Sequence, residues 1–510
     1  MLEILDTTLR DGEQTAGVSF NSNEKLAIAQ LLLEEFRVDR IEVASARVSL
    51  GESEAFSRIC EWAAAKGFLD RVEVLGFVDG GASVDWIASC GGKVINILAK
   101  GSLKHLTTQL RKTPGEHIAD IADVVSYARS KGLTCNVYLE DWSHGIIESE
   151  EYVYELMDGL KSLDIRHFML PDTLGVLDPW STSEMMWKML RRYPALTFDF
   201  HAHNDYGFAV ANTMAAVRAG CSGVHTTVNG LGERSGNAPV AAVVAALSDM
   251  MPVKMRVDET KLTHVCKYVE SISGIRIPDN EPVVGENVFT QTSGVHADGD
   301  RKGSLYANLL LPKRFGRVRQ YALGKMSGKA NIIENLDKLG ISLSPEQIKL
   351  VTQRVVELGD KKEMMTAEDL PFIVADVLKS GHSANDNIQI VNYSLQLTKG
   401  MKPAAMLKVS IDGTEYETSS NGDGQYNAFM RALWKIYDKL GKKHPVLADY
   451  QVTIPPGGKT DALVATTIVW DMDGHEFKTR GIDSDQTEAA IKATVKMLNI
   501  IENLDLKTIK

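Results

Sequence analysis

Residues 198–205 read FDFHAHND, and this stretch has the alternation of a β-strand. Phe198 and Phe200 alternate with polar residues, and successive side chains of a strand point to opposite faces. His201 and His203 therefore share one face. Two imidazoles on the same side of a strand end can form half of a divalent-metal site. Two ordinary histidines in a polar loop are the simpler alternative for this spacing alone, so the metal interpretation needs further ligands from the rest of the chain.

The chain on both sides of this strand alternates short apolar segments with amphipathic helices up to about residue 250. Eight strands are predicted, at 2–8, 40–45, 72–78, 94–99, 134–140, 167–172, 196–202 and 223–229. The predicted helices between them include 24–36, 52–66, 117–131, 150–163, 183–193, 207–219 and 240–250. Eight βα units indicate an α/β fold, a TIM (β/α)8 barrel over residues 1–252. A doubly wound open sheet, the alternative, would carry a glycine fingerprint after its first strand, and the sequence has none there.

Helical subdomains are predicted after the barrel, at residues 253–384. Segments 329–339 and 345–359 have helical patterns, whereas 285–321 is rich in glycine and loop-like. A loop of that length in a compact protein is usually functional, so we expect a catalytic lid there. The polar segment SANDN (383–387) is predicted to link these subdomains to the last domain.

An internal repeat marks the C-terminal domain, which we place at residues 388–510. DGTEYETSSNGDGQYNAF (412–429) resembles DGHEFKTRGIDSDQTEAA (473–490), with Asp, Gly, Glu, an aromatic residue, Thr, Gln and Ala at one offset. Two copies of one strand–helix unit would bury their sheet faces together, which predicts an α+β domain. Dimerisation and the binding of a small regulatory molecule are both compatible with such a domain.

The composition narrows the classes of partner. The chain has 510 residues, of which 44% are hydrophobic and 24% charged, and its net charge is −11. An acidic, evenly charged chain argues against nucleic acid as a partner, and no apolar run is long enough to predict a membrane span. The N-terminus lacks the pattern of a signal peptide. The five cysteines are scattered, as is typical of reduced thiols, so we expect a cytoplasmic protein.

The predicted barrel brings a third metal ligand to the two histidines. The chemistry of a TIM barrel lies at the C-terminal ends of its strands, where Asp11, His201 and His203 are all expected. One carboxylate and two imidazoles suit a divalent cation and leave positions open for substrate. Asn237, after the eighth strand, could add an oxygen ligand directly or through water. A 2-oxo acid chelated at the open positions would have its ketone polarised.

Acid–base and substrate-binding candidates lie at the same strand ends. Arg10 could neutralise charge developing on the ketone oxygen, although an ion pair with Glu42 or Glu13 is the structural alternative. Thr173 could bind a substrate carboxylate, or merely cap a strand end. Glu140 and His296 are the candidates for general acid and base, and Asp298 is close enough in sequence to orient His296. Which of the two removes a proton is left open by the sequence.

Three motifs resemble those of a known enzyme family. LRDGEQ (9–14), FDFHAHNDYGFAVAN (198–212) and NGLGERSGNA (229–238) are similar to signatures of the 2-isopropylmalate, homocitrate and citramalate synthases. The resemblance spans the whole chain. It implies a metal-dependent Claisen condensation of acetyl-CoA with a 2-oxo acid, followed by hydrolysis of the thioester. It also implies a homodimer whose C-terminal domain binds leucine or isoleucine as feedback effector.

The resemblance also assigns roles to individual residues. It implies a divalent ion (Mg²⁺, Mn²⁺ or Zn²⁺) on Asp11, His201, His203 and Asn237, and catalytic roles for Arg10, Glu140, His296, Asp298 and Tyr306. An acyl-CoA lyase is a related alternative, but lyases usually carry a cysteine in the loop after strand eight, and residues 232–236 contain none. A non-catalytic amino-acid sensor with an inactive barrel is the remaining alternative, and the intact metal and acid–base residues argue against it.

Three positions bear on the choice of oxo acid. Leu75, Leu98 and Tyr138 stand where the family lines the pocket for the substrate side chain, and they resemble the citramalate synthase pattern. Bulky residues there would shrink the pocket to fit the methyl group of pyruvate. If they belong only to the barrel core, a 2-isopropylmalate synthase using 2-oxoisovalerate is the alternative, with homocitrate synthase less favoured. For the effector, the expected pocket lies near Tyr426, Tyr450 and Val464.

Overall fold

The computed structural model describes residues 1–510 except 304, 340, 361–364, 366–369, 371–372, 375–376, 378–387, 454–463 and 504–510. The chain forms two compact units, which are described separately. The barrel unit comprises residues 1–289 and 308–318, and the C-terminal unit comprises 290–307 and 319–510. The predicted linker at 383–387 lies outside the described residues. In the part of the chain that the structure describes, no helix is both long and apolar enough to cross a bilayer.

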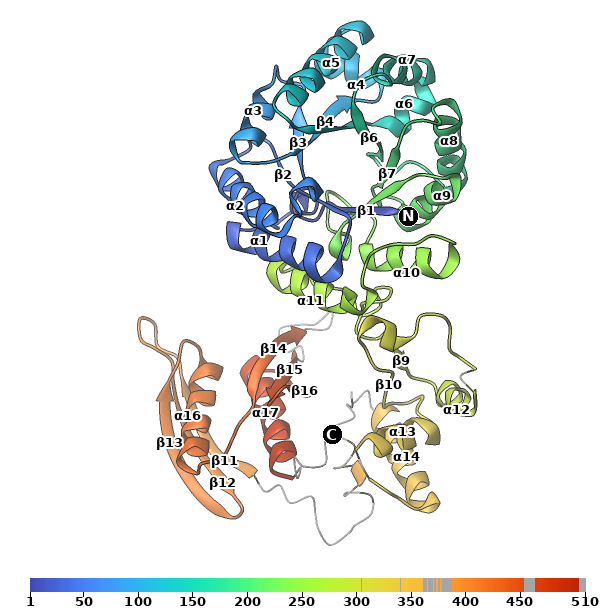
Figure 1. The fold of residues 1–510 in the computed structure, drawn as a ribbon. Coiled ribbons are helices and arrows are strands. Elements are labelled where there is room, and N and C mark those ends of the chain that lie inside the picture. The colour runs from blue at the N-terminus through green and yellow to red at the C-terminus, as the bar shows by residue number, and fades with distance from the viewer. Residues whose placement is uncertain are drawn as a thin grey trace. The chain divides into compact units, whose positions relative to one another are not determined.

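The barrel unit is a closed cylinder of parallel strands, which confirms the predicted TIM barrel (Figure 1). Each strand pairs with its sequence neighbours, and β1 closes the cylinder by pairing with β8, with Leu5 opposite His225. The strands are β1 (Glu3–Asp6), β2 (Arg40–Ser45), β3 (Val72–Phe77), β4 (Val94–Lys100), β5 (Thr134–Glu140), β6 (Ile165–Asp172), β7 (Phe198–Ala202) and β8 (Gly223–Thr226).

Helices surround the cylinder, and local capping residues determine where several of them begin. The Thr113 side chain accepts a hydrogen bond from the amide of Glu116, whose carboxylate binds the Thr113 amide in return, so α5 starts at Pro114. The helices are α1 (Ser22–Gln30), continued by a π-helical turn (Leu31–Phe36), α2 (Leu50–Lys66), α3 (Ala82–Ser89), α4 (Leu103–His105), α5 (Pro114–Ser130), α6 (Trp142–Glu148), α7 (Glu150–Leu160), α8 (Pro179–Arg192), α9 (Ala209–Ala219), α10 (Val240–Met250) and α11 (Leu262–Ser273).

The barrel interior contains a buried ionic cluster. Arg40 on β2 pairs with Glu73 on β3 at 3.1 Å and with Asp199 on β7 at 2.5 Å. His167 and His225 also contact the Asp199 carboxylate. Burial by itself would raise the pKa of Asp199, but the Arg40 charge and the two histidines outweigh it and hold that pKa well below its usual range. Asp199 is therefore an ionised anchor deep in the barrel.

The C-terminal unit contains the two repeats seen in the sequence. Each repeat is a three-stranded antiparallel sheet followed by a helix, which is the arrangement the duplication predicted. Both copies turn at an Asp-Gly pair, Asp412-Gly413 and Asp473-Gly474, whose φ angles are all positive. Two-residue hairpin loops require that conformation, and Asp-Gly adopts it readily. The elements are β11 (Ile388–Gln396), β12 (Ala404–Ile411), β13 (Thr414–Asn421), α16 (Gln425–Lys439), β14 (Val446–Thr453), β15 (Val464–Met472), β16 (His475–Asp483) and α17 (Gln486–Asn503).

The stretch 285–321, predicted to be loop-like, contains a helix. The elements of this stretch are β9 (Thr290–Gln291), α12 (Gly294–Gly303), a 3-10 turn (Pro312–Phe315) and β10 (Gln320–Tyr321). The helices α13 (Lys329–Lys338) and α14 (Pro345–Asp360) follow it. Two of the glycines that suggested a loop, Gly294 and Gly299, are closely packed instead. A Cβ on Gly294 would lie 2.5 Å from the Cα of Gly328, and one on Gly299 would lie 2.5 Å from the Tyr306 ring.

Replacing Arg40 by methionine should destabilise the barrel by about 3–5 kcal/mol, because the Asp199 carboxylate then stays buried without its closest cation. Urea unfolding followed by far-UV circular dichroism measures the loss. Arg129→Met is the matched control, since Arg129 pairs with Asp164 at the exposed surface, where a pair contributes about 0.2–1 kcal/mol. Equal destabilisation by the two variants would show that the buried cluster contributes no more than a surface pair.

Candidate active site and metal centre

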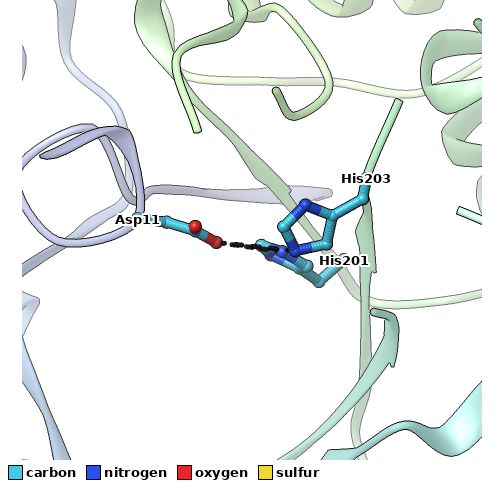
Figure 2. A group of neighbouring side chains, drawn as sticks. All are labelled: Asp11, His201 and His203. Carbon is cyan, nitrogen blue, oxygen red and sulfur yellow. Dashed lines mark ion pairs between the residues drawn. The ribbon is translucent and has the colours of Figure 1, made fainter. Parts of the chain in front are cut away.

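Asp11, His201 and His203 come together at the C-terminal end of the barrel (Figure 2). One ligand atom from each lies within 4.8 Å of the others. The Asp11 Oδ2 atom is 3.2 Å from His201 Nε2 and 4.0 Å from His203 Nε2. Asp11 follows β1, His201 lies on β7 and His203 just beyond it, so three points of the chain converge on one centre. All three residues are buried.

The charge states and unused atoms of this centre suit a divalent cation. Burial, and then the neighbouring His201, lower the pKa of His203 to about 3, so its imidazole is neutral at physiological pH, as a metal ligand must be. Burial opposes ionisation of Asp11, but Arg10 and the two histidines hold its pKa well below the usual range. Asp11 Oδ1 is buried and has no hydrogen-bond partner among the described residues. A cation would satisfy that oxygen.

Asn237 lies beside His203, and its role as a fourth metal ligand stays a prediction. It forms an isolated β-bridge with His203, and its Nδ2 donates to the carbonyl of Leu231 at 3.1 Å. Because the amide nitrogen is used in this way, the Oδ1 atom is left as the free acceptor. That oxygen is buried and unpartnered within the described part of the chain. The set of one carboxylate, two imidazoles and one amide oxygen fits a divalent ion and keeps positions open for substrate.

Arg10 forms the ion pair with Glu42 that was the structural alternative, and its predicted catalytic role stays a prediction. Its Nε donates to Glu42 at 2.7 Å, whereas Glu13, the other predicted partner, pairs with Lys25. An Arg10 terminal nitrogen also lies 3.3 Å from the Asp11 Oδ2 atom, and the side chain is 10% exposed. The ion pair with Glu42 therefore holds the guanidinium beside Asp11 of the metal centre.

Glu140 ends β5 and has a partner that sequence reasoning missed. The Lys100 ammonium, at the end of β4, pairs with the Glu140 carboxylate, and the two residues are register neighbours in the sheet. Lys100 is held by its backbone, since its amide donates to His117 and its carbonyl accepts from the Tyr152 hydroxyl. The prediction ended strand four at Ala99 and so overlooked a lysine directly after an apolar run, which was the available signal.

The three predicted pocket residues pack together inside the barrel. Leu75 and Tyr138 are buried in a small cluster with Leu5 and Met169, and the half-buried Leu98 packs against it. Leu98 and Tyr138 are register neighbours on β4 and β5. The cluster is separate from the main core around the barrel. We call Leu75, Leu98 and Tyr138 the apolar wall, and their contact with a substrate stays a prediction.

Tyr138 ties this wall to the charged part of the mouth. Its hydroxyl lies 3.1 Å from His225 Nδ1 and donates to Glu42 at 3.3 Å. Arg10 also donates to that hydroxyl, at 3.5 Å. His225, a second residue that sequence reasoning missed, was visible only as an inward-facing polar residue in the eighth strand.

Thr173 serves the backbone in this structure. Its hydroxyl oxygen accepts a hydrogen bond from the Asp141 amide at 2.9 Å, which matches the capping alternative. The predicted contact of Thr173 with a substrate carboxylate stays a prediction.

The remaining acid–base candidates belong to the other unit. His296 and Asp298 lie on α12, and the His296 ring packs against Tyr306 with 4.2 Å between ring centroids. The Asp298 carboxylate pairs with Lys302 at 2.6 Å, so the ring of Tyr306, rather than Asp298, is the neighbour that the structure shows for His296. The catalytic roles of all three stay predictions.

Comparisons with known proteins give the family. Residues 1–269 match the HMGL-like model, 283–363 the homocitrate synthase post-HMGL domain-like model, and 364–502 the LeuA allosteric (dimerisation) domain model. An (R)-citramalate synthase of Methanocaldococcus jannaschii is 31% identical, over 99% of this chain and 100% of its own length. A 2-isopropylmalate synthase of the same organism is 32% identical, over 98% of this chain and 94% of its own length. A Methanopyrus kandleri protein provisionally named an (R)-citramalate synthase is 36% identical, over 91% and 88%.

The chain belongs to the family of 2-isopropylmalate, homocitrate and citramalate synthases. This confirms the family predicted from the three motifs, and with it an acyl-CoA-dependent acyltransferase. Members of the HMGL-like family are generally metal-dependent, which agrees with the centre formed by Asp11, His201 and His203.

The residues predicted near the effector lie in the C-terminal unit, within the match to the LeuA allosteric (dimerisation) domain model. Two of the three residues predicted near the effector touch, since the rings of Tyr426 on α16 and Tyr450 on β14 have centroids 5.6 Å apart. The Tyr426 hydroxyl lies 2.6 Å from Thr494 Oγ1 on α17. Val464 is buried at the start of β15. The pair of tyrosines thus joins elements of both repeats, and its effector role stays a prediction.

Replacing His203 by alanine should weaken Mn²⁺ binding by at least about 100-fold, because loss of an outer partner of a metal ligand alone costs roughly 10–100-fold. Isothermal titration calorimetry of metal-free enzyme gives the affinity. His264→Ala is the control, since His264 is exposed on α11. An unchanged Mn²⁺ affinity in His203→Ala would remove this histidine from the metal site.

Proposed function

We propose that this synthase condenses acetyl-CoA with pyruvate and hydrolyses the resulting thioester, releasing CoA and (R)-citramalate. The observation that carries the choice of pyruvate is the apolar wall of Leu75, Leu98 and Tyr138. Overall identity does not decide between the two activities, because relatives named for each are 31% and 32% identical. A wall of bulky side chains leaves room for a methyl group and crowds an isopropyl group. The second candidate is a 2-isopropylmalate synthase, because a relative of that name is as similar to this chain.

The charged side of the mouth would hold the oxo acid. Asp11, His201, His203 and the Asn237 oxygen would bind the divalent ion, which when bound supplies Lewis acidity toward the ketone of the substrate. Arg10, fixed by Glu42, offers further positive charge at the same place, so charge that develops on the ketone oxygen is neutralised as the new carbon–carbon bond forms.

The proton from the acetyl methyl group needs a base. We propose Glu140, which ends β5 and pairs with Lys100, as one candidate for that role, because a carboxylate can accept a proton. His296 is the other candidate, with Tyr306 stacked on its ring. We propose that one of these two residues, Glu140 or His296, is the base.

We further propose that the enzyme is a homodimer inhibited by isoleucine bound in the C-terminal unit. The match of residues 364–502 to an allosteric dimerisation domain supports the first part. Two arguments support inhibition by isoleucine. An aliphatic side chain can pack against the aromatic pair of Tyr426 and Tyr450. An enzyme that makes citramalate would also be regulated by the branched amino acid that is made from its product.

Wild-type enzyme should use pyruvate in preference to 2-oxoisovalerate by roughly tenfold to hundredfold in kcat/KM, because two extra carbons overpack the apolar wall. Leu98→Ala should narrow this ratio, mainly by weakening the use of pyruvate. Release of the free CoA thiol from acetyl-CoA, measured with pyruvate and with 2-oxoisovalerate, gives kcat/KM for each acid in each protein. Leu190→Ala is the control, since it shortens a half-buried leucine on the outer helix α8. A wild-type preference for 2-oxoisovalerate would identify a 2-isopropylmalate synthase instead.

Tyr450→Ala should raise the isoleucine concentration needed for half inhibition by about tenfold or more, since it removes one ring of the proposed pocket and an aromatic contact is worth about 0.5–1.5 kcal/mol beyond its buried area. Uninhibited kcat should be retained. The control is Tyr416→Ala, a half-buried tyrosine on β13. Equal inhibition of wild type and Tyr450→Ala would place the effector elsewhere.

A further inference from the structure

Asp141, the residue directly after Glu140, has a strained backbone. Its φ and ψ angles are 63° and 32°, which is the left-handed region. A residue with a Cβ in that region costs free energy and persists only where its surroundings determine it strongly. Residues with such backbone angles are common at active sites. The contacts of Asp141 therefore indicate which part of the site depends on this conformation.

Hydrogen bonds fix the backbone on both sides of the strained residue. The amide of Gly101 donates to the Glu140 carbonyl at 2.6 Å, and the amide of Asp141 donates to Thr173 Oγ1 at 2.9 Å. The Asp141 carbonyl accepts from the Gly145 amide at 3.0 Å in the first turn of α6. Any Cβ on Gly145 would clash with the carbonyl of Gly101. The loop after β4, the loop after β6 and α6 therefore all close on Glu140 and Asp141.

Two histidines hold the side chain of Asp141. Its Oδ1 lies 2.8 Å from His144 Nδ1, and its Oδ2 lies 3.4 Å from His105 Nε2. The carboxylate is buried, and each of its oxygens pairs with one imidazole. His105 belongs to α4 and His144 to α6, so the carboxylate joins the segments that follow β4 and β5. We call His105, Asp141 and His144 the His–Asp–His clamp.

We propose that Asp141 is a positioning residue, and that the His–Asp–His clamp holds the left-handed turn that directs Glu140 toward Lys100 and the barrel mouth. The inference rests on the proposed function, in which Glu140 is an acid–base residue of the condensation. Asp141 contacts the two histidines and the neighbouring backbone, so it acts through Glu140. The direction of a strand-end side chain depends on the turn that follows it, and the clamp determines that turn.

Three substitutions separate the two properties of Asp141, its carboxylate and its tolerance of a left-handed backbone. Asp141→Asn keeps the left-handed preference and one acceptor oxygen, so kcat should stay within about threefold of wild type. Asp141→Gly allows the backbone angles but removes the carboxylate, and Asp141→Ala removes both. For these two, kcat should fall about 10- to 100-fold, the loss that a small misplacement of a reacting group produces. KM for both substrates should change less than about threefold, because Asp141 contacts histidines.

Arg37→Ala is the matched control, because Arg37 also has a left-handed backbone, with φ of 65°, and precedes β2 at the opposite end of the barrel. It should leave kcat within about threefold of wild type. Circular dichroism identifies any variant that has lost its fold, and Asp141→Gly, which is free of backbone strain, keeps the test available if Asp141→Ala unfolds.

Native folding with wild-type kcat in both Asp141→Gly and Asp141→Ala would overturn the inference. A fall in kcat that is as large in Asp141→Asn as in Asp141→Gly would also overturn it. Glu140→Gln distinguishes this failure from a failure of the proposed function. An inactive Glu140→Gln beside a fully active Asp141→Gly removes only the positioning role, whereas full activity of Glu140→Gln removes the acid–base role of Glu140 and the present inference with it.

Discussion

Closure of the barrel by pairing of β1 with β8 is the constraint on which the candidate active site depends. Asp11 follows the first strand, and His201 lies on the seventh, 190 positions later in the chain. They meet because β8 pairs with β1 on one side and with β7 on the other. Closed parallel pairing puts the C-terminal ends of all the strands at one mouth, so residues remote in sequence face a common point. Without closure, Asp11 would lie at one edge of a sheet and the histidines near the other.

The interior of the barrel carries charge in two connected layers. The deeper layer is the ion cluster of Arg40, Glu73 and Asp199, and His225 contacts both Asp199 and the hydroxyl of Tyr138. Tyr138 in turn reaches the upper layer of Arg10 and Glu42. Buried charges are costly unless paired, and the pairing is what fixes the geometry of each group. The wall proposed to select the substrate and the guanidinium beside the metal centre are therefore held by the same network.

The two units of the chain are built by different means. The barrel depends on long-range parallel pairing, whereas each C-terminal repeat depends on local antiparallel hairpins closed by Asp412-Gly413 and Asp473-Gly474. Hairpins of this kind need few distant contacts, so a single unit could be duplicated without disturbing the barrel. The Tyr426–Tyr450 contact is one of several between the two repeats, which share one hydrophobic core.

The sequence by itself determined the barrel, the family, the pair of histidines on one strand face and the repeat, because each depends on local periodicity or on a short motif. It left Arg10 open between a catalytic role and an ion pair with Glu42, since that question concerns distances between different strands. Tertiary structure alone decided that Lys100 pairs with Glu140 and that Asp141 adopts a left-handed turn. An aspartate can take that conformation, but no local pattern requires it. The requirement comes from histidines and glycines that the fold brings from neighbouring segments.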